Sequence, residues 1–420
     1  MHQPLSLRKN FSWSLFGNIA GSGFRWLILM IIAKMTDTEH AGYYTLALSI
    51  TGPIIMFTML QLRAAYVTDV CEEYPYGYYI GVRLFTNVLA ALVLGGVLFF
   101  MKGRYEAIVY GVIFVVFLNK AIESTADIFY GVMQKHDRLD KVAISTMLRQ
   151  GGGALVLFAG LWLTGSLLCG VIAIGFCWLA VLFFYDRKNA EVFEKCQPLF
   201  EPRAYKMIIL TGIPLGITRG LIALDESIPR YFVEGYLGTS EQGIFSAMAY
   251  VITAAYLFVE ALGYSVVARL ARYYNYNQKI YIRVLLKVTA IAFLMGFVCV
   301  LVTLAAGRQL LTILYNPEYA KYPDVFVWLM VLATGKMISS MLNHGMNATR
   351  YFKSQVPLNV FSVLITAGCC MPLVPLYGLK GAVWAMLGGV IVKIAGSIFV
   401  IQYALKHNSV LIEKGNPGSL

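Results

Sequence analysis

Charged side chains recur inside long apolar segments of this 420-residue sequence, at spacings typical of a helix. Lys120, Glu123 and Asp127 stand three and four residues apart, so a helix would carry them on one face. Arg25 shares a face with Asn18 in another apolar segment. A charge at the centre of a bilayer costs about 2.5–3.5 kcal/mol on the insertion scale. We therefore expect these side chains to face a hydrated cavity or a partner.

The intramembrane charges divide into candidate ligand-binding bases and the acids that accompany them. Arg25, Arg219 and Lys336 have no acid three or four residues away in the same segment, which makes them the main candidates for binding an anion. The planar guanidinium of Arg also matches two phosphate oxygens at once. The full set of candidate cavity residues is Arg25, Lys120, Arg219, Arg230 and Lys336, with the acids Glu123, Asp127, Asp225 and Glu226. The acids would hold the bases in place or bind a coupling proton or sodium ion.

A simpler interpretation of two of these spacings stays open. Lys120 with Glu123, and Glu226 with Arg230, could be local helical ion pairs that only neutralise each other. The five bases outnumber the four acids, which favours an anionic ligand.

The composition identifies the kind of protein that must position these charges. Hydrophobic residues make up 59% of the chain and charged residues 13%, about half the roughly 25% of soluble domains. No soluble fold of this length buries so much apolar surface. The sequence therefore indicates an integral membrane protein and excludes secreted disulfide scaffolds, disordered chains and ordinary cytosolic enzymes.

Twelve apolar segments are long enough to cross a bilayer, at about 20 residues each. They are 11–33, 43–65, 78–100, 107–132, 142–163, 167–185, 207–231, 243–268, 282–305, 322–348, 356–376 and 381–405. The predicted fold is all-α, with twelve transmembrane helices in two six-helix bundles. The predicted domains are an N-terminal bundle (1–185), a cytoplasmic linker (186–206), a C-terminal bundle (207–405) and a cytoplasmic tail (406–420).

The two halves show weak internal similarity at an offset of about 200 residues, as in Gly42-Tyr43-Tyr44 and Gly243-Ile244-Phe245. Six helices return the chain to its starting side, so the repeat would be parallel, as in some transporters. Chance similarity between apolar helices is the alternative. In this alignment the charged segments 11–33 and 207–231 are counterparts, and so are 107–132 and 322–348.

Lysine and arginine predict the orientation. With the N-terminus inside, 22 of them fall in cytoplasmic segments, Arg63, Arg83 and Arg149 included, and 6 fall outside. This bias places both termini in the cytoplasm. It also accounts for most of the net charge of +12 without nucleic acid as a partner.

No catalytic motif is present. The sequence lacks HExxH, the P-loop pattern and GxSxG, and its seven cysteines and five histidines have no metal-ligand spacing. The predicted outer loops are at most about 15 residues, which disfavours a glycan polymerase or ligase, since these enzymes usually need a sizeable outer loop for the site. We expect a transporter rather than an enzyme, with no catalytic residue, metal or cofactor beyond a coupling proton or sodium ion.

Segment 207–231 contains Gly212, Pro214, Gly216, Gly220 and Pro229, which predict a broken or bending helix that could gate a cavity. Close packing by small residues is the alternative explanation of the glycines.

Several patterns together resemble a known family. They are Asn18, Gly21 and Arg25 in the first segment, Gly42-Tyr43-Tyr44-x-Leu46-Ala47 at the start of the second, and Gln61-Leu62-Arg63-Ala64 followed by Asp69. They are similar to the polysaccharide-transporter branch of the MOP flippase superfamily, the Wzx-type exporters, over the whole chain.

The resemblance implies two six-helix bundles that form a V around a cationic central cavity. It implies a flippase that moves an undecaprenyl-pyrophosphate-linked oligosaccharide across a bacterial cytoplasmic membrane by alternating access, with Arg25, Arg219 and Lys336 on the pyrophosphate. The glycan would be an O-antigen, capsule or teichoic-acid unit. The lipid bilayer and the polysaccharide polymerase and chain-length machinery are the implied partners. A MATE-type cation-coupled drug or metabolite antiporter remains the alternative, and a membrane glycan polymerase or ligase is a weaker one.

Overall fold

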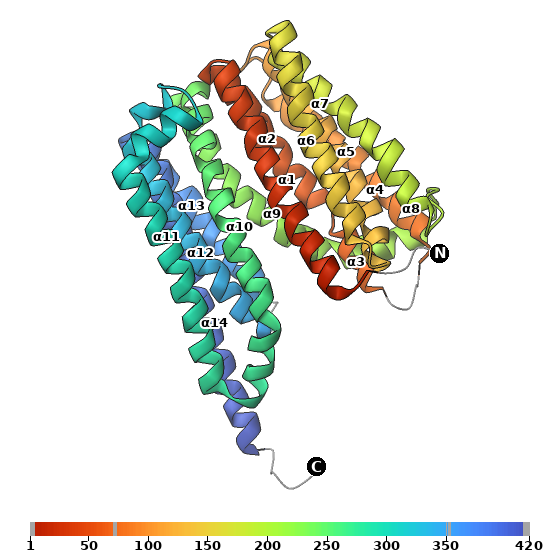
Figure 1. Cartoon of the computed structure of the whole chain (residues 1–420), viewed down its shortest axis with the longest axis vertical. Helices are drawn as coiled ribbons and strands as arrows, with labels where there is room; N and C mark the ends of the chain where they lie inside the picture. The colour runs from red at the N-terminus through yellow and green to blue at the C-terminus, as the bar shows by residue number, and fades with distance from the viewer. Residues whose placement is uncertain (1–4, 70–73, 350, 352–353, 415–420) are drawn as a thin grey trace. The chain divides into compact units, whose positions relative to one another are not determined.

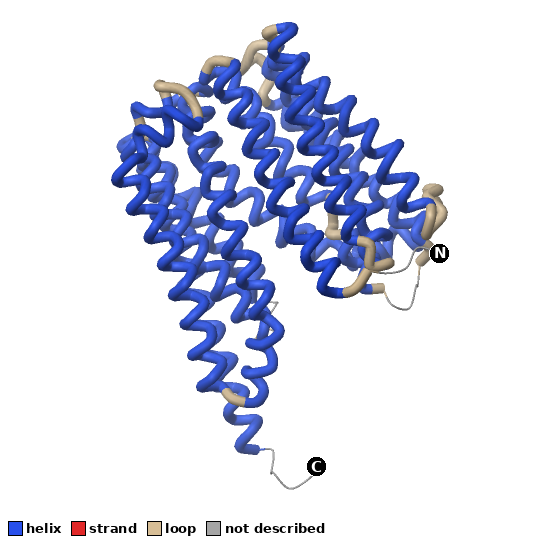
Figure 2. The backbone as a smooth tube through the Cα atoms, in the orientation of Figure 1, coloured by secondary structure: helices blue, strands red, loops and turns tan. Residues whose placement is uncertain are grey.

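The computed structural model describes residues 5–69, 74–349, 351 and 354–414. All regular secondary structure in these residues is helical (Figure 2). Cys71, Arg350, Lys353 and residues 415–420 of the predicted tail lie outside the described residues. The prediction of an all-α protein is therefore confirmed for the part of the chain that the structure describes.

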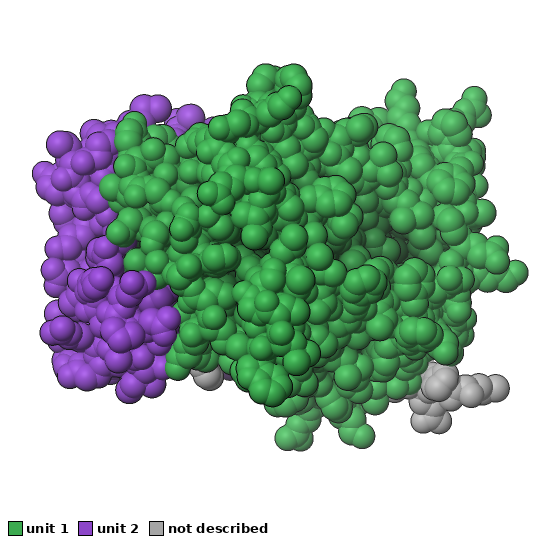
Figure 3. Space-filling model, turned by 90° about the horizontal axis from the view of Figure 1, so that it is seen from above, with its two compact units in different colours: residues 1–247 green, residues 248–420 purple. Residues whose placement is uncertain are grey.

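The chain forms two compact units, residues 1–247 and 248–420 (Figure 3). We call them unit 1 and unit 2 and describe each by itself. The division falls inside a long helix, α10, whose first residues pack in unit 1. There the Thr45 hydroxyl donates to Oε1 of Gln242 over 2.9 Å. The sequence predicts a linker at 186–206 between two repeated six-helix bundles, and this division stays a prediction.

Unit 1 holds the first nine α-helices and the start of α10 (Figure 1). They are α1 (Leu7–Met35), α2 (Thr38–Thr58), α3 (Leu62–Thr68), α4 (Tyr76–Phe100), α5 (Ala107–Lys135), α6 (Leu139–Thr164), α7 (Leu167–Val181), α8 (Lys188–Glu191), α9 (Pro202–Leu237) and residues 239–247 of α10 (Thr239–Tyr276). A π-helical segment, η1 (Leu182–Arg187), joins α7 to α8.

Unit 2 contains the rest of α10 and four further α-helices. They are α11 (Gln278–Leu314), α12 (Pro323–Ala348), α13 (Gln355–Tyr377) and α14 (Leu379–Lys414), with a 3-10 turn, η2 (Tyr319–Lys321), before α12. α11 has a kink at Ala306, where the backbone leaves the helical region (φ −134°, ψ 17°). Buried Tyr281, Met337 and Met341 belong to the hydrophobic core of unit 2.

Eleven candidate membrane spans are found among the described residues by length and composition. α10, with 38 residues, stands where the sequence predicts the eighth of twelve transmembrane helices. Large apolar side chains such as Phe100, Leu155 and Phe176 are exposed on these helices, as expected where the solvent is lipid. The chain is a multi-pass membrane protein.

Local sequence signals account for several helix ends. Asp37 precedes α2 and accepts a hydrogen bond from the backbone N–H of His40 over 3.0 Å, and Asn277 caps α11 in the same way. Burial opposes the charge of Asp37, but hydrogen bonds from the backbone and ring of His40 lower its pKa. Gly165 follows α6 with φ of +64°, a conformation that glycine adopts without strain.

The glycines of α9 allow close helix packing. α9 is continuous through Pro214 and Pro229, so the predicted break in this segment is wrong, whereas the predicted bending stays a prediction. A Cβ at Gly212 would lie 2.7 Å from the carbonyl oxygen of Leu60, and one at Gly216 2.7 Å from that of Phe57. α9 thus packs directly on the end of α2, and the alternative of small-residue packing is confirmed.

α1 packs on α6 by the same means. A Cβ at Gly17 would lie 2.6 Å from the side chain of Ala143, and one at Gly21 would lie 2.6 Å from Thr146. Close approach of these two helices brings their polar residues together.

Gly216→Ala and Gly95→Ala should have opposite effects on stability. In a helix, Gly→Ala stabilises by about 0.4–1 kcal/mol. A Cβ at Gly95 on α4 meets open space, whereas one at Gly216 meets backbone and forces α9 from α2, at a cost of about 1–3 kcal/mol. Thermal unfolding of the purified protein in detergent would measure this. Equal unfolding temperatures for both variants would contradict the packing role of Gly216.

Candidate functional site

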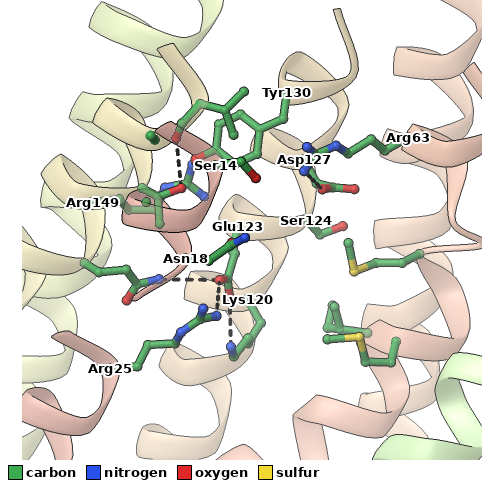
Figure 4. Close-up of a pocket in the computed structure, with 18 of the residues that line it drawn as sticks. Ser14, Asn18, Arg25, Arg63, Lys120, Glu123, Ser124, Asp127, Tyr130 and Arg149 are labelled. Carbon is green, nitrogen blue, oxygen red and sulfur yellow. Dashed lines mark hydrogen bonds and ion pairs between the residues drawn. The ribbon is translucent and has the colours of Figure 1, made fainter. Parts of the chain in front are cut away.

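A cavity of about 310 Å³ lies within unit 1 among α1, α2, α3, α5 and α6 (Figure 4). Its polar lining side chains are Ser14, Asn18, Arg25, Arg63, Lys120, Glu123, Ser124, Asp127, Tyr130, Thr146, Arg149 and Gln150. Met56 of α2 and Met59, which directly follows α2, contribute an apolar part of the wall.

Helical periodicity explains why these side chains converge. Ser14, Asn18 and Arg25 follow one face of α1, at spacings of four and seven residues. Lys120, Glu123 and Asp127 follow one face of α5, as the sequence predicts. The structure thus brings four of the predicted site residues into one cavity: Arg25, Lys120, Glu123 and Asp127.

Glu123 holds the basic side chains of one part of the cavity. Its Oε2 accepts a hydrogen bond from Lys120 Nζ over 2.8 Å, so the predicted local ion pair exists. Its Oε1 lies 3.7 Å from Nη1 of Arg25 and accepts from Nε2 of Gln150 over 3.4 Å. Arg25 therefore finds on α5 the acid that its own helix lacks. One carboxylate serves two bases, which leaves excess positive charge.

Asp127 forms a second ion pair in the cavity, and its partner comes from α3. Nη1 of Arg63 donates to Oδ1 of Asp127 over 3.2 Å, and Nε of Arg63 donates to Oε1 of Gln134 over 2.8 Å. Just before α3, Leu60 and Gln61 have φ of 49° and 50°, the left-handed region that side chains other than glycine rarely adopt. This strained joint between α2 and α3 sets the position of Arg63.

Arg149 and Asp186 form a buried ion pair behind the cavity. Nη2 of Arg149 lies 3.2 Å from Oδ2 of Asp186, and the two side chains are 3% and 0% exposed. The same nitrogen donates to the Tyr130 hydroxyl, and to Ser145 Oγ over 3.3 Å. Asp186 reaches this pair from the π-helical segment η1.

Sequence reasoning missed three charged residues of this site. It counted Arg63 and Arg149 among cytoplasmic charges and placed Asp186 at the start of the linker. Arg63 and Asp186 stand at predicted helix ends, where a charge is ordinarily solvated, and Arg149 lies about two turns inside segment 142–163. The left-handed joint directs Arg63 inward, and the π-helical segment directs Asp186 inward to Arg149. Neither irregularity has a simple sequence signal.

The other predicted site residues do not line this cavity. Arg219 and Glu226 are exposed on α9, and Asp225 and Arg230 are half-buried there. Lys336 is half-buried on α12, in unit 2. Their predicted role in ligand binding or ion coupling stays a prediction.

The charge balance of the cavity favours an anion. Its charged lining residues are four bases, Arg25, Arg63, Lys120 and Arg149, and two acids, Glu123 and Asp127. Asp186 neutralises Arg149 from behind the wall, so Arg25, Arg63 and Lys120 face two acids and one positive charge remains in excess. In a partly dehydrated site, such an excess attracts negative charge more strongly than it would in water. Among the described residues, no group of three or more His, Cys, Asp or Glu side chains could hold a metal ion.

Unit 2 contains a smaller polar cluster. The Ser340 hydroxyl on α12 donates to Oε1 of Glu260 on α10, and Nε2 of His344 lies 3.6 Å from Oε2. A Cβ at Gly263 would overlap the ring of His344, so the helices touch there.

Comparison with known proteins places the chain among polysaccharide biosynthesis proteins. The family model of that description matches residues 7–273, which include the whole cavity of unit 1. The capsular polysaccharide biosynthesis protein CapF of Staphylococcus aureus is 27% identical over 385 residues. That match covers 89% of this chain and 94% of CapF.

Solved structures of low sequence identity share the fold. An inward-facing multidrug resistance MATE family transporter of the MOP superfamily has a TM-score of 0.73 at 12% identity, over 96% of both chains. A point mutant of the MATE transporter VcmN of Vibrio cholerae has a TM-score of 0.66 at 14% identity, with the same coverage. A MOP superfamily transporter of Pyrococcus furiosus, described as having a binding pocket of reverse polarity, has a TM-score of 0.65 at 12% identity over 96% of both chains. The fold is that of the MOP transporters.

Asp186→Asn should destabilise the protein by about 3–5 kcal/mol, because it leaves Arg149 buried without a counter-charge. Glu191→Gln is the matched control, since its ion pair with Arg187 is exposed and worth about 0–1 kcal/mol. The double variant Arg149→Met/Asp186→Leu should recover most of the loss. Thermal or denaturant unfolding in detergent measures all three variants, and equal losses for Asp186→Asn and Glu191→Gln would contradict the prediction.

Proposed function

This chain belongs to the polysaccharide biosynthesis protein family, and on that premise we propose that it is a lipid-linked oligosaccharide flippase. It moves an oligosaccharide linked to undecaprenyl pyrophosphate from the inner to the outer leaflet of a bacterial cytoplasmic membrane, by alternating access. The similarity to CapF, a capsular polysaccharide biosynthesis protein, supports a surface polymer as the destination of the glycan.

The cationic cavity inside a membrane-spanning unit is the observation that carries this proposal. A pyrophosphate headgroup brings negative charge that must be neutralised away from bulk water. The side chain of Arg25 is 45% exposed although it lies beside Glu123, so its guanidinium is accessible to a ligand in the cavity. Arg25 binds two phosphate oxygens and Lys120 a third, while Glu123 fixes both bases between transport cycles.

The remaining candidate residues have roles in the same proposal. Arg219, Arg230 and Lys336 bind the headgroup at another stage of transport. Asp127, Asp225 and Glu226 hold bases in place or bind the coupling proton or sodium ion. Both termini lie in the cytoplasm, and the polymerase and chain-length machinery receives the flipped precursor.

A cation-coupled drug or metabolite antiporter is the second candidate, because several structural neighbours are MATE transporters. The excess of bases in the cavity argues against cationic drugs as its ligands. Resistance to cationic dyes on overexpression would favour the antiporter.

Lipid analysis of a deletion strain tests the proposal. We expect a complete undecaprenyl-linked oligosaccharide to accumulate and its surface polymer to disappear, measured by mass spectrometry of extracted lipids. Any second flippase gene is deleted in the same strain, because its product could move the same lipid and hide the loss. An unchanged lipid pool with an intact polymer would then overturn the proposal.

Arg25→Ala should abolish export of the surface polymer while the protein still reaches the membrane. The variant loses both contacts of Arg25 to phosphate, and each charge-assisted hydrogen bond contributes about 1.5–3 kcal/mol to binding. Arg8→Ala is the matched control, because Arg8 is an exposed cation of the same helix that does not line the cavity. Surface-polymer immunoblots and membrane-fraction blots provide the readouts. Normal export by Arg25→Ala would refute the assignment of the anion site.

A further inference from the structure

Arg83 on α4 is a buried cation without a hydrogen-bond partner. The residue is 1% exposed, and Nε, Nη1 and Nη2 each lack a partner among the described residues. Buried charges in proteins are ordinarily paired, because an unpaired one loses its hydration and gains nothing in return. Such a guanidinium calls for an anion within its reach.

The packing of α4 on α5 identifies that anion. Nδ2 of Asn87 donates to Thr125 Oγ1 over 3.0 Å, and Ser124 Oγ donates to Oδ1 of Asn87 over 3.1 Å. The two helices follow each other through a short loop and run antiparallel. Arg83 lies one turn before Asn87 on α4, and Asp127 lies about one turn after Ser124 on α5, so both stand at one level. Asp127 is also the acid that acts electrostatically on Arg83.

Asp127 is engaged with another base in this structure. Its Oδ1 accepts from Arg63, and among the described residues its Oδ2 has no hydrogen-bond donor. Arg63 is 28% exposed and lines the cavity, whereas Arg83 does not. One carboxylate thus stands within the electrostatic reach of two arginines and binds the one that faces the cavity.

The attachment of Arg63 is suited to movement. The two left-handed residues before α3, Leu60 and Gln61, are a strained joint, and strained backbone is a common property of switching segments. The carbonyl of Leu60 rests directly on Gly212 of α9, so displacement of α9 would act on the joint. Arg83, in contrast, belongs to a regular helix, about two turns from its start.

We propose that Asp127 exchanges partners, holding Arg63 in the state described here and Arg83 in another state that frees Arg63 for an anionic ligand. This inference rests on the proposed function for its ligand, the phosphate headgroup. Arg83 is then a positioning residue: it never touches the ligand, but it competes for the carboxylate that restrains Arg63. The exchange keeps every charge paired when the headgroup binds.

Chemical modification tests the exchange without any ligand. The full-length protein in nanodiscs is treated with phenylglyoxal, which reacts with accessible guanidinium groups, and the Arg63 peptide is followed by mass spectrometry. Arg83→Met should slow modification of Arg63 about tenfold. Without Arg83, nothing competes for Asp127, so Asp127 holds Arg63 more of the time, and one charge-assisted hydrogen bond corresponds to about this factor. Asp127→Asn in the Arg83→Met background should restore the rate, because nothing then holds Arg63.

The control is Lys141→Met, which removes a buried cation of α6 that does not line the cavity. It should leave the Arg63 rate unchanged. Arg83→Met should unfold at the same temperature as the wild type or higher, because it removes an unpaired buried charge. A purely structural Arg83 would instead give a less stable protein and no rescue by Asp127→Asn. Equal Arg63 rates in the wild type, Arg83→Met and the double variant would overturn the proposal.

Binding of inorganic pyrophosphate, measured by calorimetry on the same samples, separates this proposal from the proposed function. The exchange predicts that Arg83→Met binds about tenfold more weakly and that the double variant recovers. If the wild type does not bind pyrophosphate but the Arg63 rates change as expected, the headgroup assignment fails and the exchange stands. If pyrophosphate binds equally to all variants and the Arg63 rates are equal, the exchange fails and the anion site stands.

Discussion

The cost of an unpaired charge inside the membrane governs the structure of unit 1. Glu123 is the clearest case, because a single carboxylate lies beside Lys120 of its own helix and Arg25 of another. This arrangement neutralises the charge of the acid completely and the charges of the two bases only partly. The positive character of the cavity therefore follows from an unequal pairing of bases and acids.

Burial separates the ion pairs into fixed and adaptable ones. Arg149 and Asp186 are almost wholly enclosed, and the Tyr130 and Ser145 hydroxyls add hydrogen bonds to the same guanidinium. Such a pair holds α6 against the π-helical segment η1 and gives the cavity a rigid wall. Arg25 and Arg63 are partly exposed, so water or a ligand can replace their present partners. The rigid wall and the exchangeable bases together suit a site that must bind and release.

Sequence reasoning succeeded where one helix determined the outcome. The spacing of Lys120, Glu123 and Asp127 was sufficient to place them on one face, and the apolar segments were sufficient to place the helices. The contact of Arg25 with Glu123 joins helices about a hundred residues apart, which periodicity within one helix does not reveal. For α9, prolines and glycines fitted both a break and close packing, and only the position of Phe57 and Leu60 against it decided between them. Arg63 and Asp186 were missed because irregular backbone directs them inward.

The π-helical segment Leu182–Arg187 has a consequence for the length of the chain. An α-helix turns about 100° per residue, and a π-turn accommodates one residue more than an α-turn. Asp186 therefore faces Arg149 only because the helix contains this additional residue. Removing any one residue between 182 and 185 would restore a regular helix and rotate Asp186 toward a different neighbour. In this segment the number of residues is constrained more strictly than their identity, so homologous chains that keep the pair should vary here by substitution and not by insertion or deletion.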